Sequence, residues 1–243
     1  MSDDDVGWSR SKLAGAVREA LLSALFRPLI AVWVQREVTG LHHLKDLERP
    51  VIFVANHCSH MDTPLILRAL PWTWRWRTAV AAAADYFYKQ RLLAHAVSLA
   101  FNTVPVERNG GGVRSASVLD RLLDQGWSVV LFAEGTRSRD GVVGRLHGGA
   151  AVLAAQHDIA IVPVYVSGTH PTMPVGRRWM RRRPDGSRQH VRVAFGPAIP
   201  HPGREHRKEV MERVRLFFES QGAATTPDRT VANRRRALTA ATR

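Results

Sequence analysis

The chain has 243 residues, 45% of them hydrophobic, and a formal net charge of +14 at pH 7. This length suffices for one α/β domain with a substantial core, and the basic excess predicts an anionic partner: nucleic acid, a phospholipid surface or phosphorylated small molecules. The single cysteine, Cys58, excludes an intramolecular disulfide framework and favours a reducing compartment.

The N-terminal region is polar at first and then amphipathic. Residues 3–5 are all aspartate, unlike the basic start of a secretory signal. From Leu13 to Val38 apolar residues recur at three- and four-residue steps, which predicts a helix that Pro28 kinks or divides. This basic, Leu-rich segment with Trp33 near its end suits a membrane interface, and an ordinary helix packed on the domain is the alternative. The sequence has no uninterrupted run of about 18–20 apolar residues, so it does not predict a conventional membrane-spanning helix.

Beyond this segment, short apolar runs alternate with helical patterns. Predicted strands cover residues 51–55, 101–106, 128–133, 159–166 and 191–195, and predicted helices cover residues 63–70, 85–99, 115–124, 150–157 and 207–219. Residues 79–84 fit either a strand or the start of a helix. The alternation predicts a single-domain α/β fold with a mixed, largely parallel central sheet flanked by helices.

One short stretch alternates tryptophan with polar residues. Trp72, Trp74 and Trp76 are separated by Thr73 and Arg75. Period two predicts an extended segment with three indoles on one side. Such a segment suits either the boundary between hydrocarbon and water or a core-facing edge strand.

The stretch from Val51 to Asp62 carries the first chemical signal, because a buried strand there ends in a polar turn and a helix start. An imidazole at His57 could remove a proton from a hydroxyl, and the carboxylate of Asp62 could fix its tautomer. Alternatively, His57 caps or packs a helix and Asp62 is a solvated acid. A metal site of His57, His60 and Asp62 is a third interpretation, although this set supplies few ligands. For Cys58, a small buried thiol is favoured over a nucleophile, since adjacent side chains rarely point at each other.

Two further predicted strands end in charged residues. Glu107 and Arg108 follow the strand at 101–106, and residues 134–137 follow the strand at 128–133. Because the carboxyl ends of parallel strands share one edge, we expect a base, two guanidinium groups and a glycine turn to face one cleft. Arginine suits bidentate binding of phosphate. For either arginine alone, a surface ion pair is the alternative.

These motifs resemble the glycerophospholipid acyltransferase superfamily, and most of all bacterial lysophosphatidic acid (1-acylglycerol-3-phosphate) acyltransferases. Four blocks match in order between about residues 38 and 200. They are N-H-C-S-H-M-D at Asn56–Asp62, V-P-V-E-R-N at Val104–Asn109, F-A-E-G-T-R-S at Phe132–Ser138 and I-V-P-V at Ile161–Val164. The first and third blocks together are specific. Ala133 stands where the third block usually has proline, which should alter the rigidity of the turn rather than the chemistry.

The resemblance implies a role for each predicted site residue. His57 would be the general base on the acceptor hydroxyl and Asp62 its orienting carboxylate, and the hydroxyl would attack the thioester of acyl-CoA or acyl carrier protein directly. Substrate binding would fall to Arg108, Glu134, Gly135, Thr136, Arg137 and Pro163. The first five would hold the acceptor phosphate, and Pro163 would help to shape the pocket for the acyl chain or its donor. No metal ion or other cofactor is implied.

A second departure concerns the acceptor. Relatives typically carry F-K-K/R-G after the third block, where this chain has Leu146–Gly149 with Arg145 nearby. The expected reaction makes phosphatidate from 1-acylglycerol-3-phosphate, and a lyso-ornithine lipid or a lysophospholipid is the alternative acceptor. The charge also fits a nucleic-acid-binding protein, but no helix-turn-helix, zinc or RNP-type signature is present, so nucleic acid is not expected.

The resemblance also frames the domain organisation. We expect residues 1–38 to form a tail and a membrane-interface segment, residues 39–221 the acyltransferase domain, and residues 222–243 a disordered basic tail. The basic run Arg177–Arg183, which includes Trp179, fits attraction to an anionic bilayer, contact with CoA phosphates, or simply a solvated loop. The expected location is the cytoplasmic face of the cell membrane, as a peripheral or monotopic protein.

Overall fold

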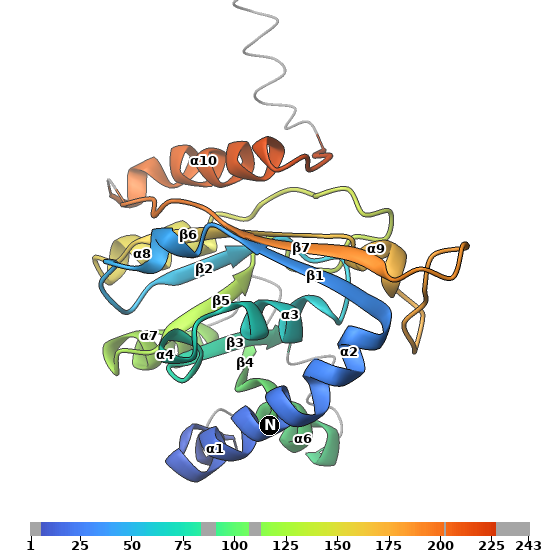
Figure 1. Ribbon diagram of the computed structural model, residues 1–243. Helices are drawn as coiled ribbons and strands as arrows, with labels where there is room; N and C mark the ends of the chain where they lie inside the picture. The colour runs from blue at the N-terminus through green and yellow to red at the C-terminus, as the bar shows by residue number, and fades with distance from the viewer. Residues whose placement is uncertain (1–5, 84–90, 107–112, 202, 227–243) are drawn as a thin grey trace, which may run out of the picture.

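The computed structural model describes residues 6–83, 91–106, 113–201 and 203–226. A seven-stranded sheet forms its centre (Figure 1), in the order β1-β7-β6-β2-β5-β3-β4. The strands are β1 (Val34–Thr39), β2 (Ile52–Ala55), β3 (Thr78–Ala83), β4 (Thr103–Val106), β5 (Ser128–Phe132), β6 (Ile161–Ser167) and β7 (Gln189–Phe195).

Helices connect and cover these strands. The α-helices are α1 (Lys12–Ala20), α2 (Arg27–Trp33), α3 (Asp62–Ala69), α4 (Trp72–Arg75), α6 (Arg91–Phe101), α7 (Val113–Asp124), α8 (Gly149–Gln156), α9 (Thr169–Thr172) and α10 (Arg207–Ser220). A π-helical turn, η2 (Leu21–Phe26), joins α1 to α2. Three short 3₁₀ helices are η1 (Gly7–Arg10), η3 (Leu41–Leu44) and η4 (Arg204–His206).

Five neighbouring strands run in the same direction. β4, β3, β5, β2 and β6 pair in parallel, β7 pairs antiparallel with β6, and β1 pairs parallel with β7. The predicted mixed, largely parallel sheet is therefore confirmed. The carboxyl ends of β2, β5 and β6 lie at one edge, where chemistry in such sheets is usually located.

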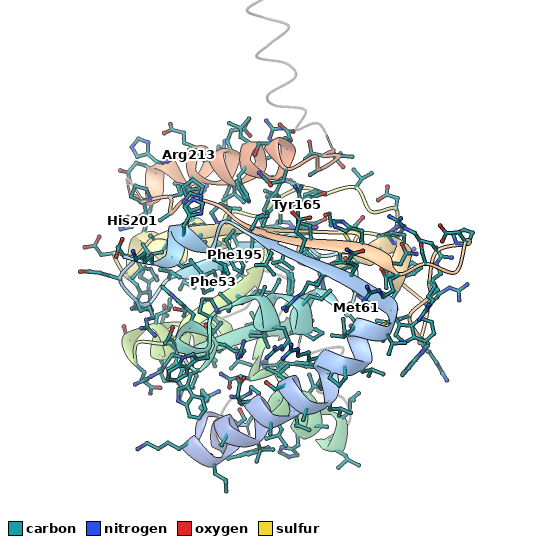
Figure 2. All side chains as sticks on the ribbon, in the orientation of Figure 1. Phe53, Met61, Tyr165, Phe195, His201 and Arg213 are labelled. Atoms are coloured by element: carbon teal, nitrogen blue, oxygen red, sulfur yellow. The ribbon has the colours of Figure 1, made fainter. Side chains whose placement is uncertain are left out.

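The sheet is covered on both faces, so its central strands are apolar on both sides. In β2, Phe53 packs with Leu65 of α3 and Leu22 of η2, whereas Ile52 belongs to the cluster that includes Phe218 of α10. Figure 1 shows α8 and α10 on one side of the sheet and α2 and α3 on the other. Figure 2 shows Phe53 and Phe195 next to each other inside, with ring centroids 6.3 Å apart.

Two predictions of secondary structure are wrong. The N-terminal helical stretch ends at Trp33, and Val34 begins an edge strand that pairs with β7 over six residues, so tertiary pairing overrides the helical pattern. Residues 72–75 form a helical turn rather than an extended segment, because Trp74 and Arg75 donate their backbone N–H groups to the carbonyl of Pro71. Trp74 is then 5% exposed and Trp72 66% exposed, so the indoles do not share one side.

The N-terminal helices are attached to the domain by buried arginines. Arg75 of α4 is buried and donates to both carboxylate oxygens of Glu19 in α1, at 2.8 and 2.6 Å. Arg18 of α1 is also buried and donates to the carbonyl of Leu99 in α6. Within the part of the chain that the structure describes, no helix combines the length and hydropathy needed to cross a bilayer. Contact of α1 and α2 with a membrane stays a prediction.

Candidate active site

The loop between β2 and α3 brings His57 and Asp62 together. Nδ1 of His57 lies 2.8 Å from Oδ2 of Asp62, the first residue of α3. The same oxygen accepts the backbone N–H groups of Cys58 and Ser59, at 2.7 and 2.8 Å. Asp62 is fully buried, and its Oδ1 is without a hydrogen-bond partner among the described residues. The carboxylate thus fixes both the shape of the loop and the orientation of the imidazole.

This orientation leaves the other ring nitrogen for a substrate. If Nδ1 carries the proton and donates it to Asp62, Nε2 carries the lone pair that a general base needs. The side chain of His57 is 17% exposed, so the ring is largely sheltered but reachable. One face stacks on Phe132, with centroids 4.0 Å apart and planes 20° apart. Phe132 ends β5, so a neighbouring strand holds the ring in place.

Glu134 supports the backbone of His57. Its Oε1 accepts the N–H of His57 at 2.8 Å, and its Oε2 accepts the N–H of Gly144 at 2.8 Å. The carbonyl of His57 in turn accepts the N–H of Ser138 at 2.7 Å. Burial raises the pKa of the Glu134 carboxyl, and the N–H groups of Gly144 and His57 oppose that rise. The carboxylate thus positions the backbone of the loop that carries His57, and binding of the acceptor phosphate by Glu134 stays a prediction.

An open pocket lies beside the third block, and Glu134, Thr136 and Ser138 of that block help to line it. Gly135 has a φ of +68°, which strains residues with a side chain. The pocket has a volume of about 410 Å³. It is lined by Glu134, Thr136, Ser138, Arg139, Asp140, Val142, Gly144, Arg145, His147 and Thr226. Arg137 is close enough to His60 for its charge to lower the pKa of that imidazole.

Three described binding candidates, Gly135, Arg137 and Pro163, are not among the residues that line this pocket. Arg108, with Glu107, lies outside the described residues. Pro163 sits inside β6 in register with Val54 of β2, and its carbonyl accepts the N–H of Gly196. The described contacts of Pro163 are therefore those of a strand in the core.

His60 and Cys58 have environments that suppress their charged forms. Burial, together with the charges of Arg137 and His57, lowers the pKa of His60 to about 4. Burial, with Asp62 and Glu134 nearby, raises the pKa of the Cys58 thiol to about 12. Across the described ranges, no three His, Cys, Asp or Glu side chains are grouped as a metal site would require. The arrangement therefore offers one sheltered imidazole with a carboxylate partner.

Asn56 and Ser59, for which the sequence predicts no role, attach the loop to neighbouring segments. Asn56 is buried and donates to the carbonyl of Val166 at 2.9 Å, while its Oδ1 accepts the N–H of Val166 at 2.7 Å. Ser59 donates its hydroxyl to the carbonyl of Met173 at 2.7 Å. The position of Asn56 directly after a buried strand indicates this role, because an asparagine amide can both donate to and accept from the backbone of a neighbouring strand.

Known proteins are similar to this chain in sequence and in fold. The sequence model of the acyltransferase family matches residues 21–167. The crystal structure of the 1-acyl-sn-glycerophosphate (LPA) acyltransferase PlsC from Thermotoga maritima aligns with a TM-score of 0.62 and 25% identity, over 89% of this chain and 81% of that one.

Two curated relatives match over a shorter range. The chloroplastic 1-acyl-sn-glycerol-3-phosphate acyltransferase LPAT1 of Arabidopsis thaliana is 30% identical over 141 residues, 57% of this chain and 38% of that protein. The human 1-acyl-sn-glycerol-3-phosphate acyltransferase alpha is 27% identical over 146 residues, 55% of this chain and 46% of that protein. The chain thus spans less than half the length of either relative. Since the family's sequence model covers more than half of the chain, and the solved relative repeats its fold, the chain belongs to the acyltransferase family.

Proposed function

We propose that this protein transfers a fatty acyl group from acyl-CoA or acyl carrier protein to the free hydroxyl of 1-acylglycerol-3-phosphate, giving phosphatidate. The single observation that carries the proposal is the 2.8 Å contact between His57 Nδ1 and the buried Asp62, which leaves Nε2 of a sheltered imidazole for a hydroxyl. The names of the relatives support the choice of acceptor.

The reaction needs one proton carrier and two correctly placed substrates. Nε2 of His57 takes the hydroxyl proton while the oxygen forms a bond to the thioester carbonyl carbon. The carbon–sulfur bond then breaks, and the thiolate takes up the proton, so the products are an ester and a free thiol. Asp62 stabilises the imidazolium that exists between these steps. The reaction as written requires no metal ion or other cofactor.

The acceptor phosphate would be held at the carboxyl end of β5. Gly135, Thr136 and Arg137 are our candidates there, with Arg108. A lyso-ornithine lipid or another lysolipid is the second candidate acceptor, because His147 lies beside Gly135 instead of a lysine or arginine. A β-carbon built on Gly135 would be 3.9 Å from Nε2 of His147. An imidazole gives a weaker grip on phosphate at neutral pH than a permanent cation does.

We further propose a peripheral or monotopic location at the cytoplasmic face of the cell membrane. Leu13, Leu25 and Trp8 of the N-terminal helical region are exposed, and exposed apolar side chains on a basic segment suit the interface of an anionic bilayer. Nucleic acid is not an expected partner.

The test is an acceptor screen with a matched variant. Purified protein, one acyl-CoA and a panel of lysolipids are assayed by release of free thiol, and we expect lysophosphatidate to be the preferred acceptor. His57→Ala should reduce turnover by about 10²–10⁴-fold. The control is His201→Ala, because Nε2 of His201 also lies 2.8 Å from an aspartate, Asp158. Figure 2 shows His201 on the opposite side of the molecule from Met61 of the active-site loop. Undiminished turnover by His57→Ala would refute the proposal.

A further inference from the structure

The connection between α9 and β7, residues 173–188, is a basic projection that we call the arm. It contains six arginines and one aspartate. From Gly176 to Arg188 every residue except Met180 is exposed, and Trp179 is 55% exposed. Figure 1 shows the arm extending beyond α9, on the side of the molecule where α2 ends and β1 begins.

Three of the arm's arginines hydrogen-bond to backbone carbonyls outside the arm. Arg182 donates to the carbonyl of Val32 at 2.9 Å and Arg188 to the carbonyl of Ala31 at 3.3 Å, both near the carboxyl end of α2. Arg181 donates to the carbonyl of Pro171 at 2.7 Å. Cations near a helix carboxyl terminus are stabilising. These contacts give the arm a defined position against α2.

Two other arginines of the arm make no such contacts with the rest of the described fold. The guanidinium groups of Arg177 and Arg178 are exposed and make no hydrogen bond or ion pair with any other residue that the structure describes. They flank Trp179 in the sequence. Val32, whose carbonyl Arg182 binds, is itself 50% exposed. The arm therefore carries an exposed indole between two exposed arginines in sequence, and the end of α2, which the arm contacts through Arg182, carries a second exposed apolar side chain.

The arm starts at the active-site loop. The carbonyl of Met173, its first residue, accepts the hydroxyl of Ser59 at 2.7 Å. Ser59 lies between His57 and Asp62, and its N–H donates to the Asp62 carboxylate. The arm therefore begins in contact with the loop that carries His57, so a surface bound to the arm lies near this edge of the sheet.

We propose that the arm is a second bilayer-docking surface, in addition to the N-terminal helices. Trp179 inserts at the boundary between headgroups and hydrocarbon, and Arg177 and Arg178 bind the phosphates of anionic lipids. An anionic bilayer explains the exposed indole and Val32 as well as the charge, whereas DNA or an acidic carrier protein requires only the charge. The docked arm brings the catalytic edge to the surface that holds a lipid acceptor. This use rests on the proposed function, but docking itself is measurable without substrates.

Vesicle binding tests the charges. Full-length protein is titrated with vesicles of phosphatidylglycerol and phosphatidylcholine, and with pure phosphatidylcholine. The double variant Arg177→Glu/Arg178→Glu should bind anionic vesicles at least about 25-fold more weakly, since each basic residue near such a surface is worth roughly a fivefold change. The control is Lys208→Glu/Arg213→Glu, which makes the same change in net charge at two exposed positions of α10. Figure 1 shows α10 away from the arm. Equal losses in both double variants, or no loss in the arm variant, would overturn the proposal.

Fluorescence tests the indole. Brominated lipids should quench the emission of the parent protein, and Trp179→Phe should lose a distinct part of that quenching. Identical quenching in both proteins would show that Trp179 stays in water and would overturn insertion. If the arm variant keeps its vesicle affinity but loses affinity for DNA or for an acidic carrier protein, the occupant is not a bilayer and the proposal fails. Circular dichroism confirms folding of each variant, and none of these outcomes depends on acyl transfer.

Discussion

The carboxylate of Glu134, at the end of β5, accepts the backbone N–H of His57, at the end of β2, across 2.8 Å. With Gly144 on its second oxygen, Glu134 ties the connection between β5 and α8 to the loop between β2 and α3. The third sequence block thus acts on the proposed base through the backbone, independently of any contact with a substrate.

Glu134→Gln should therefore reduce kcat more than it raises KM. Glutamine has one acceptor oxygen, so one of the two N–H groups would face its NH₂ group and lose its bond, which costs about 1–3 kcal/mol. If that cost falls on the position of His57, kcat drops by about 10- to 100-fold. Steady-state thiol release measures both constants. Glu209→Gln, on the exposed side of α10, should behave as the parent does, and an unchanged kcat in Glu134→Gln would contradict the positioning role.

The same carboxyl should contribute to the pH dependence of stability. Burial raises its folded-state pKa above the ordinary value of 4.5. Its stabilising contribution is then complete below pH 4.5 and is lost as the pH rises through the folded-state value. Glu134→Gln removes this titration, so the free energy of unfolding of the variant relative to the parent should increase from pH 4.5 to neutral pH. Urea unfolding at both pH values measures the difference, and a constant difference would show that burial does not perturb Glu134.

Asp62→Asn should lower kcat far more than its effect on folding stability would explain. The amide can still accept N–H groups through its oxygen, but its NH₂ group cannot accept the proton of His57 Nδ1, which favours the wrong tautomer. We expect kcat to fall by about 10²–10⁴-fold. Asp158→Asn is the matched control, because Asp158 contacts His201 over the same 2.8 Å at the surface. Thermal unfolding of both variants separates a folding defect from a catalytic one, and near-parental kcat in Asp62→Asn would argue against the pair.

Cys58 should be inert to thiol reagents in the folded protein. It is buried, and its pKa of about 12 leaves almost no thiolate at pH 8. Ellman's reagent should therefore report no protein thiol under native conditions and one per chain in guanidinium chloride. This also means that thiol release in the activity assay comes from the acyl donor. Rapid stoichiometric labelling of native protein would show that the loop opens.

The sequence was sufficient for the sheet and for the pair at its edge. Buried strands such as Val51–Ala55 were recognised because they are apolar on both faces, and the separation of His57 and Asp62 matches a strand end followed by a helix start. The direction of side chains in turns was harder to predict. For Glu134 the resemblance implies contact with substrate, which stays a prediction, whereas its bonds to the backbone N–H groups of His57 and Gly144 could not be read from the sequence of the turn.

Tertiary contacts explain the other differences. The apolar pattern before Trp33 continues into Val34 and Val38, and only pairing with β7 makes those residues a strand. The alternation of Trp72 and Trp74 imitates a strand, but the carbonyl of Pro71 starts a helical turn. The bonds of Asn56 to Val166 join residues that are 110 positions apart, so local patterns carry no trace of them.

Because β7 runs antiparallel to β6, the segment that joins the two strands can vary in length. Ser167 and Arg192 are in register across the two strands, so the residues between them form an excursion whose ends are fixed by the ladder. Each doubling of the length of such a loop costs only about 0.6 kcal/mol in closure entropy. The exposed part of this excursion can consequently be lengthened with little entropic penalty to the strands, whereas loss of Arg182 or Arg188 would remove their bonds to α2. Changes of length in the proposed bilayer-docking arm would therefore leave the register of β6 and β7 in place.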